Sequence, residues 1–132
     1  MKIKILTICF AVTALLTLGS TAGFAHHGQI AYNHDKPITL KGTVTEFAWS
    51  NPHVQIYFDV KDANGKIVHW SCETLSPGRL TRAGWKKNSL KPGDPIAVTL
   101  IPAKTGAPVG YLHKLVLTAT GKELGTQDRP NY

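Results

Sequence analysis

Apolar and polar side chains alternate along five short runs of this sequence, and this pattern restricts the possible folds more than any other feature. A period of two residues puts successive side chains on opposite faces of a β-strand, so each run predicts a strand with one buried face. Five such strands in a chain of this length predict one all-β domain around a single core. The runs span residues 38–49, 53–61, 66–74, 95–102 and 110–120.

The first run changes phase partway along. Apolar residues hold every second position from Ile38 to Val44, whereas Phe47 and Trp49 follow in the opposite phase. An inserted residue restores the inward face after such a change, so we expect a bulge or bend near Thr45–Glu46. In the last run, unbroken alternation predicts one face carrying Tyr111, His113, Leu115, Leu117 and Ala119.

The second and third runs are expected to form a hairpin. The segment Asp62-Ala63-Asn64-Gly65 between them has the composition of a tight turn, in which Gly65 supplies a positive φ. Matching the inward residues of the two runs predicts the register. The expected pairs are Val60 with Val68, Phe58 with Trp70 and Ile56 with Cys72.

This register also places two histidines. His69 faces Asp59, which predicts an exposed cross-strand pair, while His53 lies level with Leu75. The two histidines are then separated by about 20 Å along the strands. One metal ion therefore cannot contact both.

Residues 76–85 contain the expected helix. Ser76 suits the N-cap, Pro77 suits the first turn and Gly84 suits the end. Three strands, a short helix and two further strands follow the order of an OB-fold. We therefore expect a five-stranded OB-fold-like barrel with one short helix between strands 3 and 4. An open β-sandwich of the same strands is the alternative.

The first 25 residues have the pattern of a cleaved signal peptide. Two lysines precede an apolar stretch, Ile5 to Leu18, that is too short to span a membrane. Small residues favour cleavage after Ala25, and a second site after Ala22 is the alternative. We expect a periplasmic or secreted protein with no transmembrane segment after cleavage. Its parts are a signal peptide (1–25), an N-terminal arm (26–37), the barrel domain (38–121) and a C-terminal tail (122–132).

Removal of the signal leaves a moderately basic chain with one cysteine. The signal carries two of the 15 basic residues and none of the 8 acidic ones, so the net charge falls from +7 to +5. In an exported protein, anionic envelope polymers or acidic ligands are the expected partners for such a charge, rather than nucleic acid. The basic residues are scattered along the chain, however, and this distribution favours ordinary solubilising charge. Cys72 shares an apolar face with Val68 and Trp70, so we expect a buried, inert thiol. The oligomeric state is left open.

Six histidines are the main chemical anomaly, because imidazole binds copper, zinc and nickel. Cleavage after Ala25 makes His26 the first residue, so that its α-amine and imidazole can chelate one ion. We expect copper as the candidate cofactor, with His27, His53 and His113 as further ligands. The alternative is that His26 and His27 form a polar terminus without a metal.

A second candidate site lies where the first two strands meet. Trp49, Asn51, His53 and Tyr57 are close together there in the sequence. OB barrels use this region for oligonucleotides and oligosaccharides, so these residues form a candidate platform for a small ligand or an envelope polymer. The alternative is that the aromatic rings only cover the edge of the core.

Several segments resemble a family of small secreted bacterial proteins of unknown function. His26-His27-Gly28 resembles the family's Ala-His-His-Ser opening, with Gly28 at the usual serine position. The resemblance implies an exported domain of this extent and implies no activity. It continues in Lys36-Pro37-Ile38-Thr39-Leu40-Lys41-Gly42-Thr43-Val44, Asn51-Pro52-His53-Val54, Trp70-Ser71-Cys72-Glu73, Arg82-Ala83-Gly84-Trp85 and Ser89-Leu90-Lys91-Pro92-Gly93-Asp94.

Three functions are compatible with these features. The leading expectation is a non-enzymatic periplasmic binding or accessory module, with an optional copper site at the mature N-terminus. The second is a copper-dependent oxidative enzyme that uses the same site. The third is a binder of anionic envelope polymers that does not use the histidines.

Overall fold

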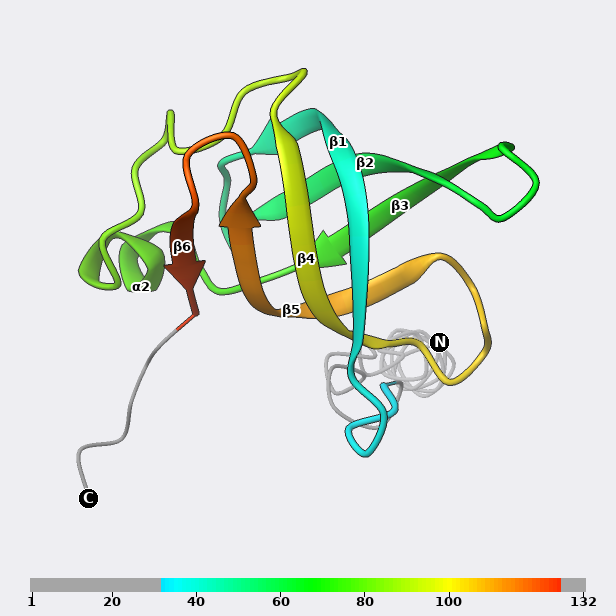
Figure 1. The fold of residues 1–132 in the computed structure, drawn as a ribbon. Helices are drawn as coiled ribbons and strands as arrows, with labels where there is room; N and C mark the ends of the chain where they lie inside the picture. The colour runs from blue at the N-terminus through cyan, green and yellow to red at the C-terminus, as the bar shows by residue number, and fades with distance from the viewer. Residues whose placement is uncertain (1–31, 127–132) are drawn as a thin grey trace, which may run out of the picture.

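The computed structural model describes residues 32–126, in which the strands coil around a common core (Figure 1). The five expected strands and the short helix are present, and a sixth strand follows them. None of the helical segments in these residues has the length and apolarity needed to cross a bilayer. The elements are β1 (Ile38–Ala48), β2 (Gln55–Lys61), β3 (Ile67–Glu73), α2 (Pro77–Arg82), β4 (Pro95–Pro102), β5 (Val109–Leu117) and β6 (Lys122–Gly125).

The sheet closes on itself to form the expected barrel. Its strand order is β3-β2-β1-β4-β5-β6, and each of these neighbouring pairs is antiparallel. A parallel pairing between β3 and β5 joins Ser71–Glu73 to Val109–Tyr111 and completes the circle. The prediction of a five-stranded OB-fold-like barrel with a helix between strands 3 and 4 is therefore confirmed.

The hairpin register follows the prediction. Phe58 pairs with Trp70 and Ile56 pairs with Cys72, while Asp59 faces His69 across the two strands. At the turn, Gly65 has a φ of 79°, and the Asp62 carboxylate accepts hydrogen bonds from two backbone N–H groups. The turn chemistry and the inward apolar side chains thus specify the same alignment.

Bulges interrupt both β1 and β5. In β1, Val44 pairs with Phe58 and Glu46 with Tyr57, so Thr45 is the extra residue and the predicted bulge is confirmed. In β5, Thr99 pairs with Lys114 and Leu100 with Leu112, which makes His113 the extra residue.

The bulge in β5 corrects the expected face of that strand. Because His113 falls out of the alternation, Leu112 and Leu115 both point into the core, and the side chain of His113 is exposed. The prediction that Tyr111, His113 and Leu115 share one face was wrong, since it assumed unbroken alternation.

The region after β3 supplies two large side chains to the core. Leu80 from α2 is fully buried, and Trp85, just beyond the helix, is 1 % exposed. Gly84 has a φ of 90°, which ends the helix, and Ser76 occupies the N-cap without a side-chain hydrogen bond. The indole N–H of Trp85 donates to the carbonyl oxygen of Gly125 at 2.9 Å.

The sixth strand lies in the segment expected to be a tail. Residues 122–125 pair with β5 along Lys114–Leu117, and Leu124 is 5 % exposed. One edge of β5 thus pairs with two strands, with β3 through residues 109–111 and with β6 through residues 114–117. A four-residue strand with one buried side chain is too short to show alternation, so the sequence pattern did not reveal it.

Candidate binding face of the barrel

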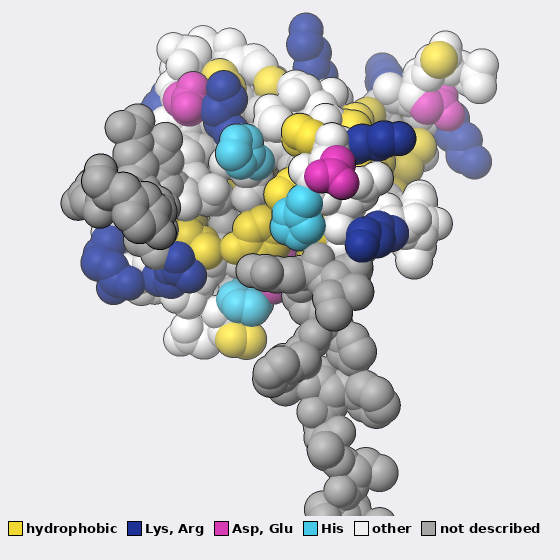
Figure 2. Space-filling view, turned by 90° about the horizontal axis from the view of Figure 1, so that it is seen from below, with side chains coloured by type: hydrophobic (Ala, Val, Ile, Leu, Met, Phe, Trp, Pro, Cys, Tyr) yellow, Lys and Arg dark blue, Asp and Glu magenta, His cyan; other side chains and the backbone are white. Residues whose placement is uncertain are grey.

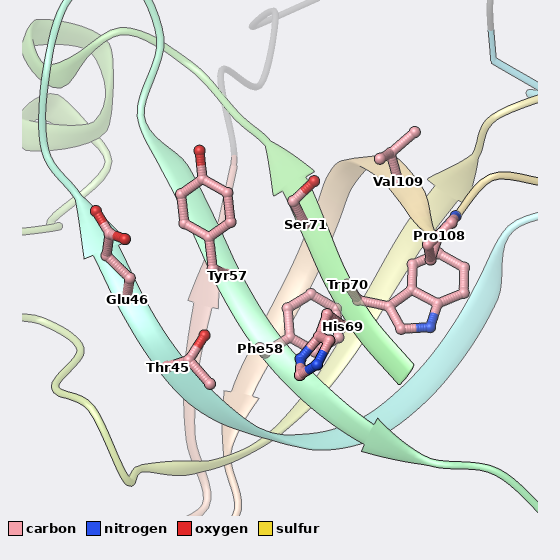
Figure 3. A pocket seen from close by; sticks show the side chains of 9 residues that line it. All are labelled: Thr45, Glu46, Tyr57, Phe58, His69, Trp70, Ser71, Pro108 and Val109. Carbon is pink, nitrogen blue, oxygen red and sulfur yellow. The ribbon is translucent and has the colours of Figure 1, made fainter. Parts of the chain in front are cut away.

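The outer face of β1, β2 and β3 carries a groove around Tyr57 (Figure 3). Tyr57 lies between Glu46 on β1 and Ser71 on β3, because it pairs with both in the sheet register. The groove is open and has a volume of about 340 Å³. We call it the Tyr57 groove, and its lining residues are Thr45, Glu46, Tyr57, Phe58, His69, Trp70, Ser71, Pro108 and Val109.

A second groove continues along the same three strands. Its volume is about 560 Å³. The two grooves occupy successive rows of one sheet, since Tyr57 faces Ser71 at one end and Lys61 faces Ile67 at the other. These two rows are about 13 Å apart along the strands. We call this the lysine groove, and it is lined by Lys41, Gly42, Thr43, Asp59, Lys61 and Ile67.

Exposed apolar side chains gather on this outer surface, which we call the binding face. Among the described residues, the large hydrophobic side chains that remain exposed are Tyr57 at 38 %, Ile67 at 39 % and Val109 at 36 %. Each of them lines one of the two grooves. Exposed apolar surface that coincides with concave surface and polar side chains is typical of a binding site.

A histidine–carboxylate pair separates the two grooves. The Nδ1 atom of His69 lies 2.6 Å from the Oδ1 atom of Asp59. The imidazole is 84 % exposed and the carboxylate 30 % exposed, so the pair stands at the surface. This is the exposed cross-strand pair that the sequence predicted, and it presents an imidazole to any ligand that crosses from one groove to the other.

The candidate platform residues lie in different places. Tyr57 lines a groove, whereas Trp49 packs edge-on against Phe47 with the ring centroids 5.6 Å apart. Asn51 is exposed in the loop after β1 and precedes Pro52 through a cis peptide bond. The structure therefore brings Tyr57 to the binding face and places Trp49 and Asn51 outside the linings of both grooves.

Sequence reasoning missed most of the groove lining. Glu46, Ser71 and Val109 were not singled out, although the outward positions of the predicted hairpin pointed to Ser71 as a neighbour of Tyr57. Val109 reaches the site only because β5 closes the barrel beside β3. No periodicity in the sequence reports that closure.

A second polar cluster lies where the N-terminal arm meets the barrel. The Nδ1 atom of His53 contacts the Oε1 atom of Glu73, and Glu73 is the neighbour of Tyr111 in the parallel pairing. The Tyr32 ring packs against the Tyr111 ring with centroids 6.2 Å apart. Burial raises the pKa of Tyr32, and the negative charge of Glu73 raises it further. Burial also raises the pKa of Tyr111, while Arg79 acts in the opposite direction and Glu73 adds to the increase.

The expected metal ligands are divided between described and undescribed residues. His26 and His27 lie outside residues 32–126, so their role stays a prediction. His53 and His113 are both exposed, and Figure 2 shows histidine side chains at the surface of one face, beside hydrophobic surface. Within residues 32–126, no three His, Cys, Asp or Glu side chains gather closely enough to hold a metal ion.

Cys72 is buried in the core, as expected. Its side chain is fully shielded from solvent, and burial raises the pKa of the thiol. A buried thiol is unreactive, because the nucleophile is the thiolate and the reagent has no access.

Cys72 is therefore expected to resist a thiol reagent in the folded protein. At pH 8, labelling by dithiobisnitrobenzoate should be slower than in about 8 M urea by at least about a thousandfold, because only the unfolded fraction reacts. Stopped-flow absorbance of the released thiolate measures both rates. Rapid stoichiometric labelling in native buffer would contradict the burial described here.

Comparison with known proteins finds one matching family and solved structures with a distant similarity to the fold. A family of unknown function (DUF6152) matches residues 14–112. No curated protein matches the chain in sequence. Two solved structures of TiaS resemble the barrel, each with a TM-score of 0.43.

The first is the ZRD-deleted mutant of TiaS in complex with agmatine, at 18 % identity over 63 % of this chain and 21 % of that one. The second is the complex of TiaS with an isoleucine tRNA and ATP, at 17 % identity over 65 % of this chain and 19 % of that one. The chain thus spans about a fifth of the length of either structure.

Proposed function

This chain belongs to the DUF6152 family of unknown function, and we propose that it is an exported, non-catalytic binding module that holds an extended acidic saccharide on its binding face. One observation carries this proposal. The exposed large hydrophobic side chains of the described residues all line two grooves that follow each other along the same three strands.

The Tyr57 groove has the chemistry that a sugar ring requires. Sugars present apolar C–H faces together with a dense set of hydroxyl groups. The half-exposed ring of Tyr57 offers an apolar surface, and the hydroxyl of Ser71 and the carboxylate of Glu46 lie on either side of it. Orientation by a few polar groups around an apolar contact is the usual design of a small-molecule site.

The lysine groove supports a ligand with acidic groups. Lys41 and Lys61 line it, and its carboxylate, Asp59, already pairs with His69. A uronic acid unit can therefore face two cations there. Glu46 and Asp59 argue against a nucleic acid on the same face, because phosphates meet those carboxylates, whereas sugar hydroxyls donate hydrogen bonds to them.

Titration with galacturonic acid hexamers tests the proposal. We expect binding with chemical-shift changes in Tyr57, Ser71 and Ile67, and an affinity that falls as salt rises, since the lysines are exposed. Tyr57→Ala should lower the affinity about tenfold or more through loss of the aromatic contact. Two-dimensional NMR and isothermal titration calorimetry provide the two measurements.

Two matched variants separate this site from general charge attraction. Lys61→Gln should weaken binding, whereas Lys122→Gln on β6 removes the same charge away from the binding face and should leave the affinity unchanged. Equal effects of the two lysine variants, or an unchanged affinity in Tyr57→Ala, would refute a saccharide site on this face.

A further inference from the structure

We propose that the chain forms a weak symmetric dimer, in which the open edge of β3 pairs with the same edge of a second copy. The contact extends the sheet from one copy into the other through residues 66–70 of each. It requires no ligand, so it goes beyond the proposed function and is tested separately from it.

One side of β3 lacks a partner strand over its first half. β5 pairs with β3 only along Ser71–Glu73, and the remainder of the β2–β3 hairpin projects from the barrel (Figure 1). Within residues 32–126, no strand pairs with the outer edge of β3 at Ile67 and His69. An unpaired edge of this kind is a template for another β-strand.

The hydrogen bonds of the hairpin show which backbone groups this edge presents. The carbonyl of Lys66 accepts a hydrogen bond from Asp62 across the hairpin, so even-numbered residues of β3 face β2. Ser71 instead donates its N–H to the carbonyl of Pro108 on the opposite side. Odd-numbered residues of β3 therefore face outward, and Ile67 and His69 present their N–H and C=O groups at the open edge.

Concave space lies beside the open edge. Part of the Tyr57 groove is bounded by His69 and Trp70 on β3 and by Pro108 and Val109 at the start of β5. Ile67 and Val109, which are 39 % and 36 % exposed, flank this space. A strand added to β3 here has room, and it removes apolar surface from water as well as pairing backbone groups.

The side chains along the edge are complementary to themselves in one antiparallel alignment. When Val68 lies opposite Val68 of the second copy, Ile67 lies opposite His69, and these two residues exchange backbone hydrogen bonds. Lys66 then lies opposite Trp70, whose half-buried ring stacks on Phe58 and can accept a cation–π contact. Apolar residues meet at the twofold axis, and no like charges lie directly opposite each other.

The neighbouring twofold alignments are less favourable. An alignment centred on His69 places two imidazoles opposite each other and requires the N–H of Ser71, which already donates to Pro108. An alignment centred on Ile67 pairs His69 with Gly65, which belongs to the hairpin turn. The edge therefore selects the alignment centred on Val68.

This dimer joins the two binding faces into one surface. Directly opposed residues of paired strands point to the same side of a sheet, so the outer faces of both copies lie on the same side. Ile67 of the second copy lies opposite His69, one row from Ser71, and thus next to Val109, the register neighbour of Ser71. Tyr57 is on β2, one strand away from the contact, and stays open to solvent.

Analytical ultracentrifugation of the full chain tests the dimer. We expect a monomer–dimer equilibrium between about 10 µM and 1 mM protein, because a contact of one short strand is smaller than most stable interfaces. Ile67→Lys should weaken the dimer about tenfold or more, since a charge on an edge strand opposes pairing. Tyr57→Lys is the matched control, because it replaces a side chain of similar exposure (38 %) away from the edge and should leave the equilibrium unchanged.

Circular dichroism confirms that both variants are folded. A monomer throughout the concentration range overturns the proposal. Equal losses in the two variants indicate general hydrophobic association and also overturn it, as does a dimer that Ile67→Lys leaves intact.

Introduced cysteines test the alignment. In Val68→Cys the two thiols face each other in a non-hydrogen-bonded pair, with Cα atoms about 4.5 Å apart, which a disulfide can span. In Lys66→Cys the thiols lie on the same face but about 13 Å apart along the strands, which is too far. The native Cys72 is buried and should not interfere.

Mild oxidation followed by intact mass measures the cross-link. Val68→Cys should form a covalent dimer at least about ten times faster than Lys66→Cys, because only the first pair is within disulfide reach. Cross-linking at equal rates, or faster in Lys66→Cys, overturns the alignment centred on Val68.

Discussion

Trp85→Ala is expected to reduce the free energy of unfolding by about 3–5 kcal/mol, the usual range for removal of a buried tryptophan. The side chain is 1 % exposed, packs against Phe47 and anchors the segment after α2 in the core. The total free energy of unfolding of a domain is about 5–15 kcal/mol, so this variant should lose a large share of its stability. Urea denaturation followed by circular dichroism measures the loss.

Two further tryptophan variants test how burial and the indole hydrogen bond of Trp85 contribute to the free energy of unfolding. Trp49→Ala removes a half-buried ring that packs on Phe47, and it should cost about 1 kcal/mol. Trp85→Phe retains most of the volume but removes the hydrogen bond to Gly125, so we expect an intermediate loss of about 1–3 kcal/mol. Similar losses in Trp85→Ala and Trp49→Ala would contradict the position of Trp85 in the core.

Gly110→Val is expected to cost about 3 kcal/mol, because Gly110 lies where the barrel closes. It pairs with Cys72 of β3 and with Pro102 of β4. A Cβ atom there would lie 2.6 Å from Leu100 Cδ1 and 2.8 Å from the carbonyl oxygen of Ile101. The larger side chain must therefore push β5 away from its neighbours, and urea denaturation should detect the loss.

Hydrogen exchange locates the damage in this variant. The backbone N–H of Ser71 donates to the carbonyl of Pro108 at the closure, and its protection should fall more than that of amides in the β2–β3 hairpin. Gly78→Ala is the matched control, because a Cβ atom at Gly78 meets nothing within 4 Å and the residue lies in a helix. That variant should be neutral or more stable by up to about 1 kcal/mol. Destabilisation by both variants would contradict a specific clash at Gly110.

The hairpin shows how far local patterns reach. Alternation from 54 to 60 and from 68 to 72, with a turn between them, predicted the register that pairs Phe58 with Trp70. The same alternation predicted the His69–Asp59 pair. The alternation did not predict the contact between His53 and Glu73. The register identifies residues that lie directly opposite each other, whereas the direct partner of Glu73 is Gln55 and His53 is its diagonal neighbour.

The two bulges show where pattern reading stops. Around Thr45 the apolar positions change phase, so the insertion is visible in the sequence. Around His113 both phases contain apolar residues, since Leu112 and Val116 occupy even positions while Tyr111, Leu115 and Leu117 occupy odd ones. The choice between them depends on which side chains the neighbouring strand β4 can accommodate, and that is a property of packing.

Patterns in the chain were enough to specify the order of the first five strands, the helix between the third and fourth, the hairpin register and the burial of Cys72. All of these depend on interactions between residues near each other in the chain, or on the burial of one face of a strand. Burial of one face makes apolar and polar residues alternate along the sequence. Three features came from tertiary structure: the pairing of β3 with β5, the addition of β6 and the assembly of the binding face. In each case residues from distant segments meet when the sheet curls and closes, and closure leaves no periodic signal in the chain.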